Sequence, residues 1–400
     1  MPGPLQGFRI IDLTAMIAGP MATMILGDQG AEVIKVENPD GGDYVRKGAN
    51  RQGDFSAGFL NNNRNKKSVA INLKDERGRA VLRRLIKGAD VFVQNFRPGV
   101  IERMGFGEDA VREIEPNIVY VSMAGFGFEG PFAHRPVYDP LIQAMSGLTT
   151  VQAGSDSERP RLVRTIVPDK TTALTASQAI TAALLARERT GEGQHIKLSM
   201  LAAVVSFLWG SDMGSQTFAG RELPQQAAAS FRDLVYETKE GHIAVAVMSD
   251  REWRSLTVAL NKPEWLTDER FKTPALRDKN INDRLAIIQQ ALLEKSADEW
   301  VALLESHDVP CAKVLTRNEM IEHEQVAANE IITEYEHPGA GKLRQANPAA
   351  KFSRTPAAIR AGAPALGEHT LEELSKLNYS QTDIDELVSD GVIASPARRQ

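Results

Sequence analysis

The carboxylate with the most suggestive setting in this sequence is Asp169, which lies in the segment TIVPDKTTA just before a long apolar run. A carboxylate at a helix start, in a poorly solvated place, can act as a nucleophile or as a general base. An ordinary helix cap is the alternative use of an aspartate there. Tyr138-Asp139, followed by Pro140, makes a second such spot. Spacing alone leaves both interpretations open at both places.

Polar and basic side chains cluster near the expected strand ends. Asn95-Phe96 combines an amide that can hydrogen-bond with an aromatic ring that can stack on a purine, although phenylalanine also fills cores. A helix that begins at Pro20 offers free N–H groups to an anion, or Gly19 and Pro20 merely separate strand from helix. Six basic residues can either bind phosphate or face solvent. They are Arg64, Lys66, Lys67, Lys74, Arg97 and Arg103.

Other chemistries lack their motifs. The first strand-to-helix turn, TAMIAGP, has no GxGxxG, and no GxxxxGK[ST] occurs, which disfavours nicotinamide, flavin and nucleotide-hydrolysing enzymes. The seven histidines form no HExxH, and the single Cys311 forms no CxxC. We therefore expect no metal, and chemistry that depends on a carboxylate, an amide or a hydroxyl.

Composition excludes further classes. The 400 residues include 47 basic and 52 acidic ones, so the net charge of −5 gives no reason to expect nucleic acid or an anionic membrane as partner. Cys311 cannot form an internal disulfide, and no apolar run reaches the ~20 residues that cross a bilayer. The opening MPGPLQGFRIIDL does not resemble a signal peptide. We expect a soluble, cytoplasmic protein of two or three domains.

Strands and helices alternate along the first part of the chain, which predicts an α/β fold with a parallel sheet covered by helices. The expected strands are 8–14, 31–37, 68–73, a run beginning at 89, and 118–123. The expected helices are 20–28, a segment capped by Asp75 and ending at Lys87, and 108–114. Ligands of such sheets bind beyond the carboxyl ends of the strands. The loops to inspect are therefore 14–20, 37–43, 94–99 and 124–131.

The chain changes character near 220–229, and a smaller α+β domain of roughly 225–320 follows. Before it we expect a buried helix over 171–188, a strand in GQHIKLSM and a helix over 200–218. The second domain begins with an antiparallel hairpin over 234–247 that turns at Glu240-Gly241. Its expected helices are 250–260, 281–294 and 296–306, the last with a capping box from Ser296 to Glu299. Strands at 331–336 and 342–345 and helices near 370–390 either form a third piece or return to the first domain.

Seven motifs in order resemble the class III CoA-transferases, the family of formyl-CoA transferase and carnitine CoA-transferase that also includes alpha-methylacyl-CoA racemase. The matching segments are 7–37, NRNKKSVAINLK at 63–74, ADVFVQNFRPGVIERMGF at 89–106, GFGFEGP at 125–131, VYDPLIQAMSGL at 137–148, 183–200 and LGEHTLEEL at 366–374. The resemblance implies a large Rossmann-like domain whose parallel sheet is built from both chain ends. It further implies residues 1–220 in that domain, 225–320 as the small domain, 321–400 returning to the large one, and an interlocked homodimer.

The resemblance also implies an activity: transfer of coenzyme A from an acyl-CoA to a free carboxylic acid through anhydride and thioester intermediates on Asp169. Coenzyme A is then a substrate, and no tightly bound cofactor is expected. A dicarboxylate such as succinate is a candidate acid. The residues that match the family's CoA-binding positions are Ile17, Ala18, Ile71, Asn72, Leu73, Lys74, Asn95, Phe96, Arg97, Arg103, Met104, Arg135, Val137, Tyr138 and Asp139.

Three departures from the family pattern bear on the site. Asn38 and Pro136 stand where some transferases have a basic residue, which shifts phosphate neutralisation to other cations. The candidates for it are Arg97, Arg103, Arg135 and either Lys66 or Lys74. No glycine-rich lid like that of formyl-CoA transferase lies between 210 and 245, which argues against a formyl or oxalate substrate. Arg46 and Arg164 either recognise a second carboxylate or are surface charges.

Two rival functions remain. A 2-methylacyl-CoA racemase uses a histidine and an aspartate as bases, and the family's histidine position is Tyr138 here. An ordinary tyrosine, with a pKa of about 10, is a poor base at neutral pH. A non-catalytic CoA-binding protein is the second rival, and the presence of Asp169 argues against it.

Overall fold

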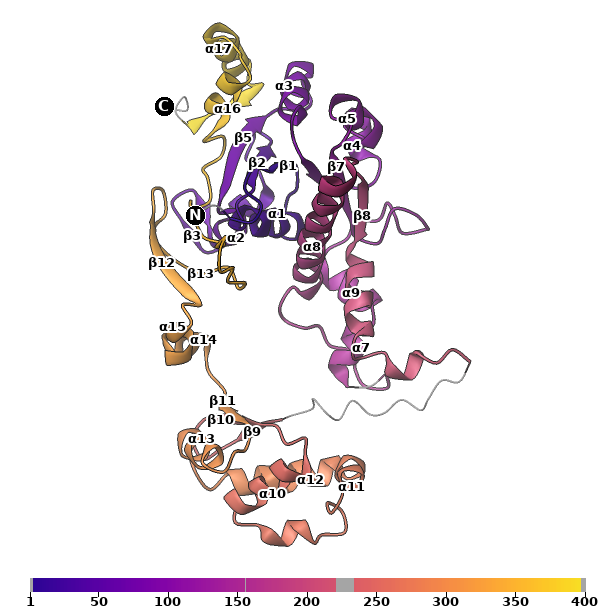
Figure 1. Cartoon of the computed structure of the whole chain (residues 1–400), viewed down its shortest axis with the longest axis vertical. Coiled ribbons are helices and arrows are strands. Elements are labelled where there is room, and N and C mark those ends of the chain that lie inside the picture. Colours follow the sequence, from indigo (N-terminus) through magenta and orange to yellow (C-terminus); the bar gives the residue numbers. More distant parts are fainter. Residues whose placement is uncertain (1–2, 155, 221–233, 397–400) are drawn as a thin grey trace. The chain divides into compact units, whose positions relative to one another are not determined.

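The computed structural model describes residues 3–154, 156–220 and 234–396 (Figure 1). The chain divides into two compact units: Met1–Thr149, Arg161–Met213 and Ala328–Gln400 form the first, and Thr150–Pro160 and Gly214–Ala327 form the second. Most of 220–229, where the sequence predicts the change between domains, lies outside the described residues, as does part of the stretch without a predicted lid.

A seven-stranded sheet organises the first unit, in the order β14-β5-β2-β1-β6-β7-β8. Its strands are β1 (Arg9–Asp12), β2 (Glu32–Glu37), β5 (Lys66–Ile71), β6 (Val91–Gln94), β7 (Val119–Ala124), β8 (His195–Ser199) and β14 (Ile393–Ala394). Neighbouring strands from β5 to β8 pair in parallel, and β14 is antiparallel to β5. The order of the six parallel strands is that of a doubly wound nucleotide-binding sheet. The predicted α/β class with a parallel sheet is confirmed.

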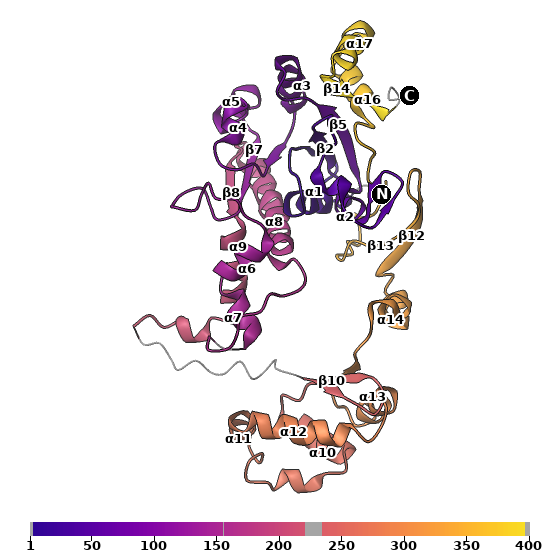
Figure 2. The ribbon, with the colours of Figure 1, turned by 180° about the vertical axis from the view of Figure 1, so that it is seen from behind.

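The sheet is buried on both faces because its strands are short apolar runs, typical of parallel sheets. One face packs Ile11, Phe92 and Tyr120 against α3 (Glu76–Ile86), α4 (Val100–Arg103), α5 (Glu108–Ile114), α16 (Thr370–Lys376) and α17 (Gln381–Ser389). The other face packs Ile10 and Val121 against α1 (Ala18–Asp28) and α8 (Val167–Thr190), which lie side by side (Figure 2). The parallel strands thus all end at one edge of a layer that is covered on both sides.

Two helix boundaries differ from the predicted ones. Helix α8 begins at Val167 rather than Thr171, with Pro168 in its first turn, where the missing proline N–H costs nothing. Asp169 therefore lies inside the first helical turn, not before it. Helix α9 (Met200–Trp209) ends well before the predicted Phe218, because Gly210, Asp212 and Gly214 are poor helix formers.

The C-terminal part of the chain returns to the sheet of the first unit. Strands β12 (Ile332–His337) and β13 (Gly341–Ala346) form a hairpin, and Ile393 of β14 pairs with Ile71 of β5. The smaller elements of this unit and its borders are β3 (Arg51–Gln52), β4 (Phe55–Ser56), α2 (Ala57–Asn63), α6 (Asp139–Met145), α7 (Leu148–Ala153) and α15 (Glu324–Ala328).

The second unit has its own core. Strands β9 (Val235–Glu237) and β10 (His242–Val245) form the predicted hairpin, and β11 (Cys311–Lys313) pairs with β10. Its helices are α10 (Asp250–Ala259), α11 (Pro274–Lys279), α12 (Ile281–Leu292), α13 (Ala297–Glu305) and α14 (Arg317–Glu322). The predicted capping box at Ser296 and Glu299 is present, and Trp253, Phe271 and Trp300 lie in the core. Among all described residues, no helix is long and apolar enough to cross a membrane.

Candidate active site

The strand order changes direction between β1 and β6, and two polar contacts join the carboxyl ends of these strands. The chain passes from β1 to β2 and β5 on one side, then crosses to β6 on the other. The Asn95 side chain, just after β6, accepts from the Ala15 N–H at 3.0 Å and donates to the Ala15 carbonyl at 2.8 Å. Ligands of doubly wound sheets bind at this switch point. Asn95 thus lies where a ligand site is expected, and its side-chain amide is already hydrogen-bonded to the main chain of Ala15.

The turn after β1 is held in an uncommon conformation. Met16 has a φ of +72°, in the left-handed region that non-glycine residues rarely adopt. Its N–H donates to Asp43 Oδ1 at 3.1 Å, and the buried Lys35 ammonium lies 3.0 Å from Asp43 and donates to the Thr14 carbonyl at 2.7 Å. Such strain persists where the surroundings hold it in place and is typical of functional sites. The result is a fixed entry into helix α1.

Asp169 faces this entry from the first turn of α8. Its Oδ1 accepts a hydrogen bond of 3.2 Å from the Ala18 N–H, at the start of α1. Burial and, after it, the negative charge of Asp139 raise the pKa of Asp169 to about 6, against the opposing effect of the Ala18 N–H. At pH 7 to 8 this carboxyl is mostly ionised yet more basic than an ordinary aspartate. Those are the properties of a nucleophilic carboxylate.

Asp139 supports the helix start that carries Asp169. It is the first residue of α6 and is buried, and its Oδ2 accepts from the Asp169 backbone N–H at 3.3 Å. Gln143, one turn later, donates to Asp139 Oδ1 at 2.6 Å and accepts from the Val163 N–H at 2.9 Å. The second acid of the pair is therefore anchored on both oxygens. Of the two predicted acids, Asp169 has the freer carboxylate.

Four of the apolar residues predicted to bind CoA lie on one face of the sheet. Ile71, at the end of β5, belongs to the core on the α3 side, and Leu73, Phe96 and Met104 are half-buried against it. Asn72 links this strand end to the tail, because its N–H donates to the Val392 carbonyl at 2.7 Å. The loops after β5 and β6 thus each present apolar side chains of the kind that can contact a purine.

Some of the cations predicted to bind phosphate are exposed, whereas others are paired with acidic side chains inside the unit. Arg97, Arg103 and Lys74 are exposed. Lys66, by contrast, is fully buried and donates to Asp12, to the Pro20 carbonyl and to Asn63. Burial lowers its pKa to about 8. The proposed phosphate role of Lys66 is wrong, because its ammonium is used inside the unit, and Arg64 is likewise paired with buried Asp28.

Arg46 also has a different role from the one considered for it. Its guanidinium forms two bonds to Glu37, of 2.8 and 2.7 Å, donates to the Pro364 carbonyl and stacks 3.6 Å from the Phe59 ring. Nine-tenths of its surface is buried. Recognition of a substrate carboxylate by Arg46 is therefore excluded, whereas Arg164 is exposed.

The segment 135–138 lies next to the end of β7. Val137 packs so closely on Gly125 that a Cβ there would lie 1.9 Å from Val137 Cγ1. Arg135 is exposed and stacks its guanidinium 3.6 Å from the Phe132 ring, and Tyr138 is 67% exposed. Ile17 and Ala18 stand at the start of α1, as described above. No contact joins Arg135 or Tyr138 to Asp169 among the interactions of the described residues.

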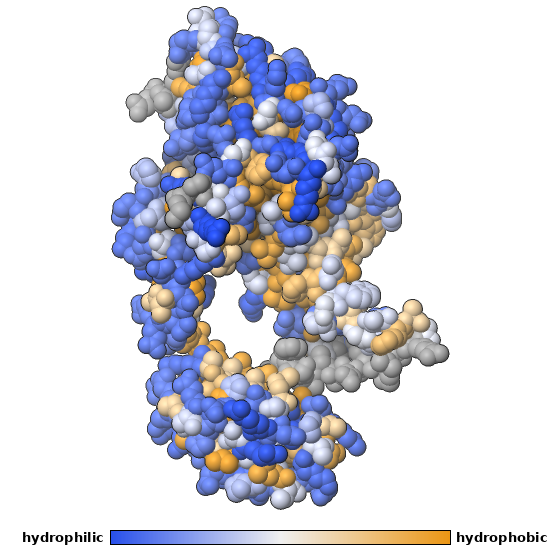
Figure 3. Space-filling view, in the orientation of Figure 1, coloured by the Kyte–Doolittle hydropathy of each residue, from blue (hydrophilic) through white to orange (hydrophobic). Residues whose placement is uncertain are grey.

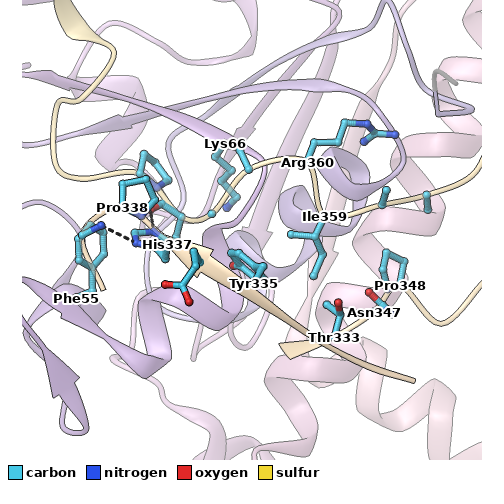
Figure 4. Close-up of a pocket in the computed structure, with 18 of the residues that line it drawn as sticks. Phe55, Lys66, Thr333, Tyr335, His337, Pro338, Asn347, Pro348, Ile359 and Arg360 are labelled. Atoms are coloured by element: carbon cyan, nitrogen blue, oxygen red, sulfur yellow. Dashed lines mark hydrogen bonds between the residues drawn. The ribbon is translucent and has the colours of Figure 1, made fainter. Parts of the chain in front are cut away.

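Two cavities of the first unit lie elsewhere. One of 1120 Å³ is lined by β12, the loop after it and residues 347–365, including Tyr335, His337 and Arg360 (Figure 4). Its polar groups are engaged: His337 uses both ring nitrogens, and Arg360 donates to the carbonyls of Gly27 and Asp28. The other, of 560 Å³, lies between α1 and β13. Asp169 and the residues matched to the family's CoA-binding positions line neither cavity, and Lys66, which lines the first, is paired with Asp12.

Sequence reasoning missed the residues that support the site. Lys35 and Asp43 clamp the turn at Met16, and Gln143 holds Asp139. The available signal was a lysine in the middle of the apolar strand EVIKVE, where a charge must be paired. Across the described stretches, no group of three or more His, Cys, Asp or Glu side chains could hold a metal ion.

Comparison with known proteins gives matches over nearly the whole chain. Residues 5–370 match the model of CoA-transferase family III. A succinyl-CoA:glutarate CoA-transferase from Mus musculus is 35% identical over 398 residues, covering 98% of this chain and 90% of its own. An acetyl-CoA:oxalate CoA-transferase from Acetobacter aceti is 33% identical, covering 92% and 94%. A solved structure of a hypothetical protein from Mycobacterium tuberculosis superposes with a TM-score of 0.81 at 30% identity, covering 93% of this chain and 99% of that one.

Proposed function

The chain belongs to CoA-transferase family III, and from that premise we propose that Asp169 is the nucleophile that carries coenzyme A between two carboxylic acids. The observation that carries the proposal is the half-buried Asp169 carboxylate, whose pKa is raised to about 6, held by the Ala18 N–H at the switch point of the sheet. Family membership shows that the chain is a CoA-transferase, whereas the covalent intermediates and the identity of the two acids are our proposal.

In the proposed reaction Asp169 is both nucleophile and leaving group. Its carboxylate attacks the donor thioester, which forms a mixed anhydride and releases CoA thiolate. The thiolate attacks the aspartyl carbonyl, which expels the donor acid and leaves an aspartyl-CoA thioester. An acceptor carboxylate then attacks this thioester to form a new anhydride and thiolate, and the thiolate takes the acyl group and frees Asp169. All four steps exchange carboxylate and thiolate leaving groups, so successive states stay close in energy. N–H groups in the segment 125–130 are candidates to stabilise the oxyanions.

Coenzyme A in this proposal lies along the carboxyl ends of β1, β5 and β6. Leu73, Phe96 and Met104 contact the adenosine, and the exposed Arg97, Arg103, Lys74 and Arg135 neutralise its phosphates. The remaining proposed contacts come from the turn at Ile17 and Ala18, from Ile71, Asn72 and Asn95, and from Val137, Tyr138 and Asp139. Their support is that most of them follow the carboxyl ends of parallel strands of one sheet.

The acids are proposed to include a dicarboxylate. Glutarate and oxalate, in the names of the two transferases given above, are both dicarboxylic acids. Arg164 is the remaining candidate for the second carboxylate, because Arg46 is paired with Glu37. A matrix of acyl-CoA donors and free acids, with transfer followed by chromatography of the CoA esters, tests this. Faster transfer to succinate or glutarate than to monocarboxylates of equal length supports the proposal, and the reverse preference contradicts it.

The pH profile should report the ionisation of Asp169. Its carboxyl attacks as the anion, so kcat/KM should fall about tenfold per pH unit below a pH of about 6. Asp139→Asn removes the neighbouring negative charge, which should lower the pKa of Asp169 and move this acid limb to lower pH. The control is Asp54→Asn, an exposed carboxylate elsewhere in the unit. A limb that stays in place in Asp139→Asn contradicts the assignment.

The enzyme is proposed to work as an interlocked homodimer. Large apolar side chains are exposed on helices of the first unit: Leu174 and Leu185 on α8, and Phe207 and Trp209 on α9. Figure 3 shows apolar residues gathered over this part of the surface. Exposed apolar patches mark interaction sites. Sedimentation should give twice the 43.8 kDa mass of the chain, and a single-chain mass at assay concentration would contradict the dimer.

Two finer expectations stay predictions. The division into 1–220, 225–320 and a returning 321–400 is one, and a digest that releases a folded fragment near 225–320 would support it. The cytoplasmic location is the other, and fractionation of cells that express the tagged chain would test it.

A further inference from the structure

A chain of side-chain hydrogen bonds runs across three strands behind the turn that follows β6. Glu108 Oε2 lies 2.5 Å from His195 Nδ1, and His195 Nε2 lies 2.9 Å from Ser122 Oγ. Gln94 Nε2 donates to the same Ser122 Oγ at 3.0 Å, and Gln94 Oε1 accepts from the Phe96 backbone N–H at 2.9 Å. The relay, defined as Glu108, His195, Ser122 and Gln94, thus ends on the main chain of Phe96.

Donor and acceptor chemistry fixes the inner end of the relay. The Phe96 N–H can only donate, so Gln94 presents its oxygen there and its NH₂ to Ser122. The Ser122 oxygen keeps a second lone pair, so the direction of its bond to His195 depends on the protonation of the ring. In the neutral form Ser122 donates to His195 Nε2, and the proton on Nδ1 is directed at the Glu108 carboxylate. Burial lowers the pKa of His195 and so favours this neutral form, against the opposing charge of Glu108.

The arrangement looks like a Ser-His-Glu nucleophilic triad, but its position argues for another role. Ser122 is only 4% exposed and Gln94 only 3%, so the hydroxyl has no access to substrate. Its oxygen already accepts from Gln94. A fully satisfied polar chain inside a sheet rigidifies what it is bonded to. Here the bonded element is the turn that carries Asn95, Phe96 and Arg97.

We propose that the relay fixes the turn after β6 in the conformation that binds the CoA thioester, with Ser122 and His195 as positioning residues acting through Gln94. The Asn95 side chain hydrogen-bonds to the main chain of Ala15 on one side of this turn, and the Gln94 side chain hydrogen-bonds to the Phe96 N–H on the other. The inference rests on the proposed function, because it takes Asn95, Phe96 and Arg97 as contacts of coenzyme A. It adds that their placement depends on groups on β7, β8 and α5, which do not touch the substrate.

The test is steady-state kinetics with the acyl-CoA varied, together with calorimetric titration of CoA, on Gln94→Met, Ser122→Ala and Glu108→Ala. Losing one relay hydrogen bond should raise KM and the Kd for CoA about five- to tenfold for Gln94→Met and Ser122→Ala, with kcat within about twofold. Glu108→Ala, at the half-exposed outer end, should give a smaller rise and keeps the test available if a buried variant fails to fold. Ser177→Ala removes a buried hydroxyl of α8 outside the relay and should change neither constant.

The double variant Gln94→Met/Ser122→Ala distinguishes positioning of the turn through Gln94 from independent destabilisation of the protein by each substitution. If Ser122 acts through Gln94, the double variant should have the KM of Gln94→Met alone, because coupled residues are not additive. Additive KM effects, an unchanged KM in all three single variants, or a fall in kcat without a change in KM would overturn the inference. Failure of the parent enzyme to bind CoA or to transfer it would instead overturn the proposed function, whatever the variants do.

Discussion

Asp169→Asn should lower kcat for CoA transfer by at least about 1,000-fold while leaving the Kd for CoA nearly unchanged. Asparagine has the same shape and can still accept the Ala18 N–H bond, so the start of α1 stays in place. It cannot attack a thioester or leave from an anhydride, so every step of the proposed reaction is lost. Transfer measured by chromatography of CoA esters, with CoA binding by calorimetry, gives the two constants separately.

The matched control is Asp283→Asn, which removes an exposed aspartate from the first turn of another helix, α12. It should keep full activity. Substantial turnover in Asp169→Asn would remove Asp169 from the role of nucleophile. A loss of CoA binding as large as the loss of turnover would instead assign Asp169 to binding.

Glu37→Gln should destabilise the first unit by about 3–5 kcal/mol, because it leaves the buried Arg46 guanidinium without its counter-charge. Glu37 accepts both Arg46 bonds, and also the Ser68 hydroxyl at 2.7 Å and the Asp43 N–H at 3.0 Å. Through Asp43 this pair also supports the turn at Met16. Urea unfolding at neutral pH, monitored by circular dichroism of the backbone, measures the shift in the midpoint of the unfolding transition.

Glu334→Gln provides the comparison, since it removes the same charge from an exposed pair with Lys342 and Arg344 and should shift the unfolding midpoint far less than Glu37→Gln does. The pH dependence gives a second check. Arg46 and its neighbours lower the pKa of Glu37 to about 2, against an ordinary value of 4.5. The stabilisation is therefore complete above about pH 4.5 and is lost as the pH falls toward 2, so parent and Glu37→Gln should converge there. Equal costs for the two variants would contradict the buried role.

The fold could largely be predicted because its strands are continuous apolar runs separated by helices at short spacing. Strands β1, β2, β5, β6 and β7 were all expected within a few residues of their observed bounds. The edge strand β14 was not, because two residues show no periodicity and the pairing of Ile393 with Ile71 depends on contacts distant in sequence. The end of α9 was placed too late because the apolar run hides the low helix propensity of the residues after Trp209.

Site residues could be predicted where the residue type decides the role. They could not be predicted where the role depends on whether the side chain is buried. Asp169 and Asn95 stand at the ends of elements, and the sheet brings both to the switch point. Arg46 and Lys66 read as surface cations, since charged residues are rarely buried, yet each is paired inside the unit. The relay was invisible to sequence reasoning because its four members come from four separate elements.

The most direct measurement of the central claim is mass spectrometry of the enzyme after incubation with succinyl-CoA and hydroxylamine. Hydroxylamine captures acyl anhydrides and thioesters, so an aspartyl intermediate becomes a hydroxamate on the side chain that carried it. We expect a hydroxamate on the peptide that contains Asp169, formed only when a reactive acyl-CoA is present and absent from Asp169→Asn. Ongoing CoA transfer with no modification at Asp169, or with the hydroxamate on a different acid, would contradict it.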